Sequence, residues 1–361
     1  MTQYGYTAMC EQTPVRQLVS DLQGAERAGF DFSVMSDHYF PWLEDQGHSG
    51  YAWAVLGAAA QATHRLPLMT MVTCPTFRYH PAVVAQKAAT IGVLSGGRFT
   101  LGLGASGPQV IEGWHGVPYD APIGRTRELI EICRKVWRRE RLEYAGKHYT
   151  IPLPPEQGTG LGKPLKLINH PVRERIPIMV AALGPKNVAL AAELAEGWQP
   201  IFYYPEKAAI AWAEPLAAGQ ARRDPSLGPL DVVAAAPLAI GADVSGYLDL
   251  ARPMFALYIG GMGPHRDKGH NFYYELAVRF GFEEAADRIQ DEYLAGRKQE
   301  AAALVPAELL EGTSLIGPEG LVADRLAAMR EAGVTTLNVT PLAGTHSERV
   351  RLIEQVRDLT T

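Results

Sequence analysis

The sequence predicts an α/β protein of the (β/α)8 TIM-barrel class. Short apolar runs alternate with amphipathic helical patterns along the 361 residues, and eight such pairs follow one another. A minimal barrel needs about 250 residues, so the chain can hold one barrel with insertions. We therefore expect a single domain over residues 1–361.

The predicted strands are short apolar runs bounded by turn residues. In chain order they are Tyr4–Met9, Phe30–Met35, Leu66–Thr73, Arg98–Leu103, Ile176–Ala182, Gly197–Ile201, Leu230–Ile240 and Thr335–Thr340. Because each one is followed by a helical pattern, the strands are expected to lie parallel in one closed sheet.

The predicted helices show apolar residues every three or four positions. The first begins with Thr13 as its cap and Pro14 at its first position, and it stops at Gly29. The others are expected at Tyr51–Thr63, Pro81–Leu94, Arg125–Arg139, Pro185–Ala195, Pro205–Arg222, Glu319–Ala332 and Glu348–Leu359.

About 110 residues exceed a minimal barrel of about 250. They fall mainly in two insertions, a Gly/Pro-rich stretch over 140–175 and a mostly helical stretch over 244–315. We expect both insertions on the side of the barrel where such folds place their chemistry.

Composition excludes several classes of protein. The net charge is −5 with both signs interleaved, so no nucleic-acid surface is expected. No apolar run approaches the ~20 residues that span a bilayer, and the first residues show no signal-peptide pattern. Cys10, Cys74 and Cys133 are odd in number and far apart, which favours the reducing cytoplasm over a disulfide framework or a metal cluster.

Polar side chains follow the second predicted strand. Ser36, Asp37 and His38 come directly after it, and Trp42 lies four residues beyond His38. The residue after a barrel strand enters the active-site mouth, where a histidine can exchange a proton and an adjacent carboxylate can orient it or bind a ring amide. The alternative, a surface turn in which Asp37 caps a helix, stays open.

Two glycine-containing loops could hold an anionic or planar ligand. Gly102–Pro108 contains three glycines, which let the backbone approach a ligand closely. Gly184 and Pro185 start a helix whose free amides could hold a phosphate, although a plain helix start explains them equally well. His265 and His270 lack a third ligand, so no metal site is expected.

Together these loops resemble the luciferase-like family of flavin and deazaflavin enzymes, and specifically its branch that depends on coenzyme F420. The resemblance spans nearly the whole chain. Its segments are Ser36–Trp42, Cys74–Tyr79, Gly104–Val110, Ala181–Asn187 and Gly333–Val339. The resemblance implies a luciferase-like barrel, F420 as cofactor, a small-molecule substrate and a homodimer.

The resemblance also implies roles for single residues. Asp37 would contact the deazaflavin ring, His38 would transfer a proton beside the ring carbon that carries the hydride, and Trp42 would form the substrate-side wall. A non-proline cis peptide would fall between Met71 and Val72 and press Val72 against the ring. The other implied cofactor-binding residues are Cys74, Ser106, Gly107, Pro108, Gln109, Val110, Ala181, Ala182, Leu183, Gly184 and Pro185.

A deazaflavin has carbon where a flavin has its reactive ring nitrogen, so it carries a hydride rather than single electrons. The protein then has to position donor and acceptor, exclude water and supply one proton. The resemblance therefore implies an oxidoreductase that moves a hydride between F420 and a small organic substrate, such as an alcohol, a carbonyl compound or an activated alkene.

The two parts of the chain resemble different F420-dependent branches. Residues 1–104 resemble the F420-dependent glucose-6-phosphate dehydrogenases, whereas residues 105–361 resemble another branch, and a fusion of two half-barrels with a seam near 104–106 would explain this. Those dehydrogenases carry a glutamate where this chain has Gly107, Pro108 and Gln109. Basic residues for a sugar phosphate are also missing around Phe202–Tyr204, whose aromatic rings favour an apolar or aromatic substrate.

Alternatives remain. One is an FMN-dependent luciferase-like monooxygenase on the same barrel, and another is a catalytically silent barrel that binds F420 without turnover. A Schiff-base aldolase is set aside because none of the predicted strands carries a lysine.

Overall fold

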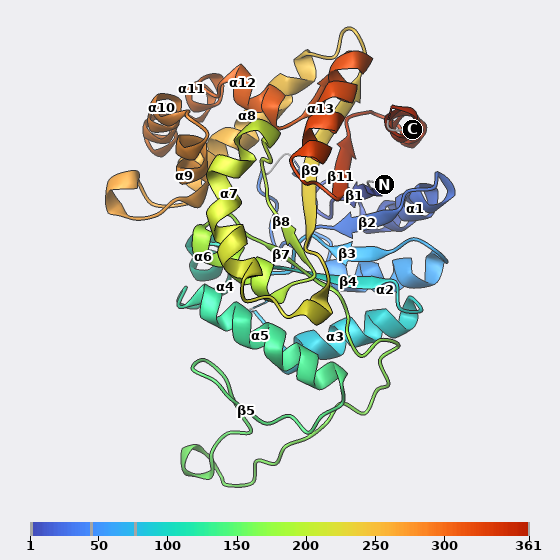
Figure 1. Cartoon of the computed structure of the whole chain (residues 1–361), viewed down its shortest axis with the longest axis vertical. Helices are drawn as coiled ribbons and strands as arrows, with labels where there is room; N and C mark the ends of the chain where they lie inside the picture. The colour runs from blue at the N-terminus through green and yellow to red at the C-terminus, as the bar shows by residue number, and fades with distance from the viewer. Residues whose placement is uncertain (1–2, 44–45, 76–77, 360–361) are drawn as a thin grey trace.

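The centre of the protein is a closed barrel of parallel strands, shown by a computed structural model that describes residues 3–43, 46–75 and 78–359 (Figure 1). The strands pair in the order β1–β2–β3–β4–β7–β8–β9–β11, and β11 pairs with β1. They are β1 (Gln3–Ala8), β2 (Phe32–Met35), β3 (Leu68–Thr70), β4 (Phe99–Gly104), β7 (Ile178–Ala181), β8 (Gly197–Gln199), β9 (Asp231–Ile240) and β11 (Thr336–Pro341). Each coincides with a predicted strand, and the predicted barrel class is confirmed.

Helices cover the outside of this barrel and keep close to their predicted ranges. They are α1 (Val15–Arg27), α2 (Ala52–Ala62), α3 (Pro81–Leu94), α5 (Pro122–Trp137), α6 (Pro185–Leu194), α7 (Pro205–Gln220), α13 (Glu319–Glu331) and α14 (His346–Asp358). The expected cap of α1 is wrong, because Pro14 occupies the N-cap position and Thr13 makes no capping bond. Gly29 ends α1 as predicted, with φ +79°.

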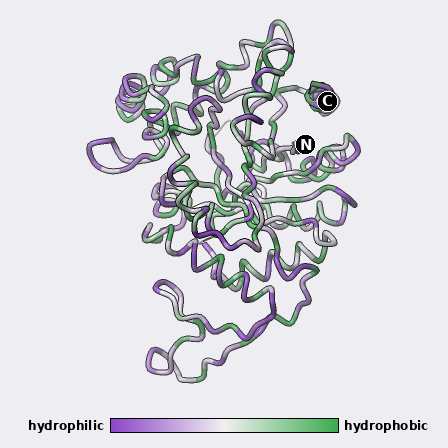
Figure 2. Tube along the Cα trace, in the orientation of Figure 1, coloured by the Kyte–Doolittle hydropathy of each residue, from purple (hydrophilic) through white to green (hydrophobic). Residues whose placement is uncertain are grey.

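The core has two layers, one inside the barrel and one between strands and helices. Phe32, Val34, Met69 and Val233 form a separate buried cluster from alternate positions of three strands, which fills the barrel interior. Leu68, Leu101 and Ile178 point the other way and pack against helices in the larger cluster. Hydrophobic segments accordingly concentrate at the centre of the trace, and hydrophilic ones lie on its outer parts (Figure 2).

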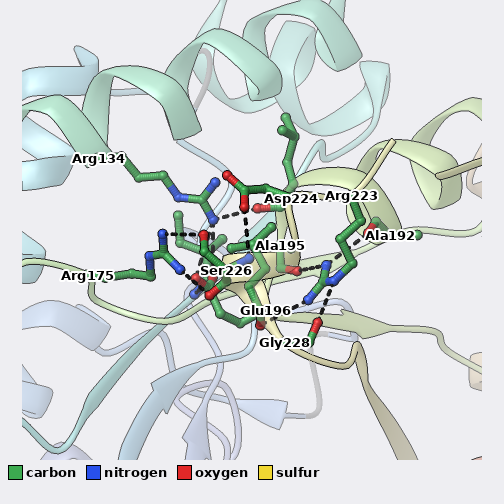
Figure 3. A network of polar contacts seen from close by, with 12 residues as sticks. Arg134, Arg175, Ala192, Ala195, Glu196, Arg223, Asp224, Ser226 and Gly228 are labelled. Carbon is green, nitrogen blue, oxygen red and sulfur yellow. Dashed lines mark hydrogen bonds and ion pairs between the residues drawn. The ribbon is translucent and has the colours of Figure 1, made fainter. Parts of the chain in front are cut away.

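Arginines hold the loops together at the amino end of the barrel, where the strands begin (Figure 3). Arg134 donates to the Leu194 carbonyl at 2.5 Å and lies 3.4 Å from the Glu196 carboxylate. Glu196 accepts the backbone N–H of Ile178 at 2.8 Å, and Arg223 donates to the carbonyl of Ala195 at 2.6 Å. These bonds join the starts of β7 and β8 to the end of α6.

The 140–175 insertion lies at this amino end, so its expected position beside the site is wrong. It leaves α5 and returns to the start of β7, and a segment that joins a helix to the next strand closes at the end where strands begin. It hangs below α5 and α3 in Figure 1. It carries the antiparallel strands β5 (Tyr144–Ala145) and β6 (Thr150–Ile151) and the short helix η2 (Pro155–Gln157).

The 244–315 insertion begins at the carboxyl end of β9 and is mostly helical, as expected. In Figure 1 its helices α9 to α12 gather far from the 140–175 loop. The chain returns through β10 (Leu315–Gly317), a short strand not predicted, which pairs with Leu238–Ile240 of β9. Its helices are α8 (Gly246–Ala256), the π-helical segment η4 (Leu257–Gly261), η5 (Arg266–Lys268), α9 (Phe272–Arg279), α10 (Glu283–Leu294), α11 (Lys298–Ala303) and α12 (Ala307–Gly312).

Two further helices were not expected, α4 (Pro108–His115) and the short η3 (Pro225–Leu227). Around the proposed seam near 104–106, β4 pairs with β3 on one side and with β7 on the other, and the half-barrel fusion stays a prediction. Within the described part of the chain, no helix is both long and apolar enough to cross a membrane.

Candidate active site

Asp37 lies at the carboxyl end of β2 and is 2% exposed. Its Oδ2 accepts hydrogen bonds from the Thr73 hydroxyl at 2.7 Å and from the Trp53 indole at 3.1 Å. Its Oδ1 lies 3.7 Å from Arg78. The alternative of a helix-capping surface turn is therefore wrong, because this carboxylate is buried and is held by the segment that follows β3 and by α2.

His38 is paired with Glu11, a residue that the sequence analysis missed. His38 Nδ1 contacts Glu11 Oε1, and Ser36 donates its hydroxyl to Glu11 Oε2 at 2.5 Å. The side chain of Glu11 is 1% exposed, whereas that of His38 is 20% exposed. Glu11 follows β1 at the same end of the barrel as Asp37 and His38, and this position was the available signal.

The pKa of Glu11 is lowered by its surroundings. Burial by itself raises it, but the hydrogen bond and charge of His38 and the hydroxyl of Ser36 outweigh burial. Glu11 is thus held as a carboxylate facing Nδ1 of His38. The other ring nitrogen, Nε2, is then the one available to exchange a proton with a bound molecule.

Trp42 begins a group of aromatic rings. Its ring centroid lies 4.9 Å from that of His38, 5.5 Å from that of Trp114 and 6.2 Å from that of Tyr258. Tyr258 also packs against Phe202, with centroids 5.5 Å apart. Trp42 therefore lies between the histidine and rings contributed by α4, by the 244–315 insertion and by the loop after β8.

Of the three aromatic residues predicted to face a substrate, only Phe202 joins this group. Tyr203 is 2% exposed and stacks on Trp212, and Tyr204 is 7% exposed and bonds Glu308. Phe202 has φ +54°, a strained conformation for a bulky residue. That backbone turn separates Phe202 from the two core tyrosines, and nothing in the residue order signals it.

The third strand ends in an irregular segment with a cis peptide between Met71 and Val72, as the resemblance implied. Pairing with β4 resumes at Thr73 and Leu103. A Cβ on Gly102 would lie 1.8 Å from the Thr70 carbonyl oxygen, and one on Gly104 would lie 2.6 Å from the Val72 side chain. These two glycines are therefore needed for the close approach of β4 to the segment that ends β3.

Two helix starts lie at the same end of the barrel. Gly107 is the N-cap of α4, with Pro108 in its first turn and Gln109 and Val110 after it. Ser106, before this helix, has φ +63°, and its carbonyl accepts the Tyr119 hydroxyl at 3.0 Å. Pro108 and Pro185 have no N–H, so the groups that could bind an anion are the N–H groups of the residues directly after these prolines.

Gly184 is the N-cap of α6, with Pro185 in its first turn. Among the predicted residues before it, Ala182 and Leu183 are buried and Ala181 is half-buried. The 244–315 insertion contacts both helix starts. Gln109 donates to the Gly261 carbonyl at 3.2 Å, and the Phe272 ring lies 2.8 Å from where a Cβ of Gly184 would stand.

Cys74 completes the predicted residues. Its thiol pKa is raised to about 11, first by burial, so it stays protonated near neutral pH. Thr76 and Phe77, which belong to the same motif, lie outside the described residues. Among residues 3–43, 46–75 and 78–359, no group of three or more His, Cys, Asp or Glu side chains is placed to hold a metal ion.

Comparison with known proteins identifies relatives over nearly the whole chain. The model of a family described as luciferase-like monooxygenase matches residues 2–336. A putative coenzyme F420-dependent oxidoreductase of Mycobacterium tuberculosis is 42% identical over 339 residues, which cover 93% of this chain and 91% of that protein. An F420-dependent glucose-6-phosphate dehydrogenase of Segniliparus rotundus is 38% identical over 54% of this chain and 55% of its own length.

Solved structures share the fold. An F420-dependent secondary alcohol dehydrogenase, in complex with an F420–acetone adduct, superposes with a TM-score of 0.77 at 22% identity and covers 100% of this chain and 99% of its own. The F420-dependent tetrahydromethanopterin reductase of Methanopyrus kandleri has the same TM-score and identity, over 98% of this chain and 97% of its own.

Proposed function

This chain belongs to the luciferase-like monooxygenase family and is an F420-dependent oxidoreductase, and we propose that it moves a hydride between F420 and an uncharged, apolar carbonyl, alcohol or activated alkene. The observation that carries the proposal is the pair of buried carboxylates, Glu11 and Asp37, at the carboxyl ends of two neighbouring strands. Glu11 holds His38, and Asp37 is held by hydrogen bonds from Trp53 and Thr73.

The described residues fit a flat ring with an anionic tail. Asp37 has a fixed position at the carboxyl end of β2, and Val72 lies against Gly104 beside it in the sheet. The starts of α4 and α6 supply backbone N–H groups for an anion. The proposal assigns the ring to Asp37 and Val72 and the tail to the Ser106–Val110 and Ala181–Pro185 segments.

The deazaflavin, when bound, supplies a carbon that accepts or donates a hydride. The protein supplies the accompanying proton. Because Glu11 faces Nδ1 of His38 as a carboxylate, it fixes the ring orientation and stabilises the protonated imidazole. His38 Nε2 then gives a proton to a carbonyl oxygen, or takes one from an alcohol, on the substrate side.

The substrate class follows from the rings around Trp42. The rings of Trp42, Phe202 and Tyr258 pack against one another and against the rings of Trp114, Phe255, Tyr273 and His38. A phosphate would instead need arginine or lysine side chains or helix amides at that position. An apolar substrate with one oxygen near His38 suits this wall, and the Tyr258 hydroxyl is a second donor for that oxygen.

The proposal is tested by titrating purified protein with F420 and with FMN and by screening turnover. We expect F420 to bind at least about tenfold more tightly than FMN, a difference of roughly 1.4 kcal/mol. We also expect turnover of reduced F420 with ketones, aldehydes or enones, or of oxidised F420 with alcohols, and none with glucose 6-phosphate.

Each alternative has its own outcome in this test. Tighter FMN binding with oxygen consumption would identify a monooxygenase, and F420 binding without turnover of any substrate would identify a silent barrel. The homodimer and the cytoplasmic location belong to the same proposal. Light scattering of the purified protein tests the homodimer.

A further inference from the structure

Lys87 on α3 lies over a cage of aromatic rings next to the candidate active site. Its ammonium nitrogen is 3.4 Å from the centroid of the Tyr79 ring, 4.2 Å from that of Trp53 and 5.9 Å from that of Tyr51. It lies 3.5 Å from the Tyr51 hydroxyl. Within the described part of the chain, Lys87 forms no ion pair with a carboxylate, so the rings are its principal partners.

One of these rings bonds Asp37 directly, and a second contacts Arg78, which also holds Asp37. The Trp53 indole donates to Asp37 Oδ2 at 3.1 Å. Tyr79 contacts Arg78 in two ways, because the guanidinium lies 5.1 Å over the Tyr79 ring and donates to the Tyr79 hydroxyl at 3.2 Å. Arg78 in turn faces Asp37 Oδ1 and donates to the Asp37 carbonyl at 3.2 Å.

We propose that Lys87 is a positioning residue for the cofactor site, which fixes Asp37 by holding Trp53 and Tyr79 through its positive charge. The inference rests on the proposed function, since Asp37 is the residue assigned to the deazaflavin ring. Attraction between an ammonium group and an aromatic face requires the charge. Loss of the Lys87 proton therefore loosens two of the three side chains that hold Asp37.

The surroundings of Lys87 lower its pKa into a range where the loss of its proton can be measured. Burial lowers its pKa to about 8, while the nearby charges of Asp37 and Arg78 act in opposite directions. Burial raises the pKa of Tyr51, which therefore stays neutral in this range. On the far side of α3, α5 presents Cys133, whose thiol pKa is also raised by burial. The amine of Lys87 is thus the group expected to titrate near pH 8.

The test compares Lys87→Met, which keeps most of the length without the charge, with Lys87→Arg, which keeps the charge at high pH. Lys298→Met is the matched control, because Lys298 is an exposed residue of α11 whose ammonium group lies 5.7 Å over the ring of Tyr293 on α10. F420 affinity is measured for each variant between pH 6.5 and 9.5. Competitive acetylation with mass spectrometry gives the titration midpoint of Lys87 without any cofactor.

We expect Lys87→Met to bind F420 about tenfold more weakly at pH 7. The reason is that Trp53 and Tyr79 lose their contacts with the ammonium group and Asp37 is held less firmly. The wild type and Lys298→Met should lose affinity as the pH passes about 8, whereas Lys87→Arg should keep its affinity to higher pH. The acetylation midpoint should lie near 8 rather than near the ordinary lysine value of 10.5.

Unchanged F420 affinity in Lys87→Met at pH 7, or a pH profile of Lys87→Arg identical to that of the wild type, would overturn the inference. If Lys87→Met does not fold, the comparison of Lys87→Arg with the wild type and the acetylation midpoint decide. If the wild type itself does not bind F420, the proposed function fails. If the wild type binds F420 and the Lys87 variants bind it equally well, only the inference about Lys87 fails.

Discussion

The two ends of the barrel use charged residues in opposite ways. At the amino end, Arg98 donates five hydrogen bonds, four of them to backbone carbonyls of α2 and of the loops that precede β3 and β4. Arg134 and Arg223 do the same around Glu196 (Figure 3). At the carboxyl end, the carboxylates of Glu11 and Asp37 are held mostly by side chains.

The difference separates stability from chemistry. Backbone carbonyls that are bonded to a half-buried arginine fix where each strand begins, and losing such a bond leaves partly buried polar groups without partners. In the proposed mechanism, Glu11 holds Nδ1 of His38 and leaves Nε2 to exchange a proton with the substrate. We therefore expect substitutions at the amino end to unfold the protein and substitutions at the carboxyl end to stop the reaction.

The largest effect is expected from His38→Ala at the carboxyl end. Removing a proton-transfer group costs about 10²- to 10⁴-fold in rate, while Asp37 and the starts of α4 and α6 are untouched. Stopped-flow measurement of hydride exchange should show this loss with F420 affinity close to that of the wild type, while the melting temperature should fall because the buried Glu11 carboxylate loses its partner. Undiminished turnover would remove His38 from the mechanism.

Arg98→Met sharpens the comparison from the other end. Its hydrogen bonds to Ala60, Thr63, Leu66 and Ser95 would be lost, leaving several carbonyls unsatisfied. Chemical denaturation should show a loss of roughly 3 kcal/mol in the free energy of unfolding. Activity per folded molecule should stay unchanged. Arg222→Met, which removes an exposed arginine while Glu193 keeps its pair with Arg127, is the control and should cost about 1 kcal/mol or less.

Tyr258→Phe tests whether the 244–315 insertion takes part in the chemistry. The ring and its contacts with Trp42 and Phe202 remain, and only the hydroxyl is lost. If the hydroxyl bonds the substrate oxygen, kcat should fall about tenfold, as expected for one hydrogen bond of roughly 1.4 kcal/mol. Tyr273→Phe, which changes a neighbouring ring in the same way, is the control. Equal rates in all three proteins would make Tyr258 a packing residue only.

The smallest effect concerns acid stability. The folded pKa of Glu11 is lowered, so its contribution to stability is present above the unfolded pKa of about 4.3 and is lost as the pH falls through the folded value. Between pH 6 and pH 3, the wild type should therefore lose more unfolding free energy than Glu11→Gln. Parallel loss in both proteins would mean that the Glu11–His38 pair does not contribute.

The barrel strands could be predicted because their apolar runs are long enough to be distinctive, even though β3 and β8 have only three residues each. β10 could not, because three residues inside a helical insertion give no periodic signal. α4 was missed although Gly107 and Pro108 form a typical helix start and Gly116 a typical end. The glycines around it indicated a loop more strongly than these signals indicated a helix.

The candidate site was predictable where a residue directly follows a strand, as Asp37 and His38 do. Glu11 was missed although it follows β1, because its contact with His38 depends on distance in space. Nothing in the order of residues shows that its carboxylate contacts a ring 27 positions away. Lys87 was missed for a similar reason, since a lysine on an outer helix is normally a solvated surface residue. Only the positions of the surrounding rings distinguish it.

The pairing of β9 with β10 has a consequence for how this protein can diversify. Gly317 lies opposite Ile240, and the backbone N–H of Gly241 donates to the Gly317 carbonyl at 3.0 Å, so the long excursion departs and returns at adjacent points of the backbone. A segment anchored in this way can be lengthened, trimmed or exchanged while the ring of strands stays closed. Changes of substrate preference in descendants of this chain are therefore expected to accumulate first in the 244–315 insertion.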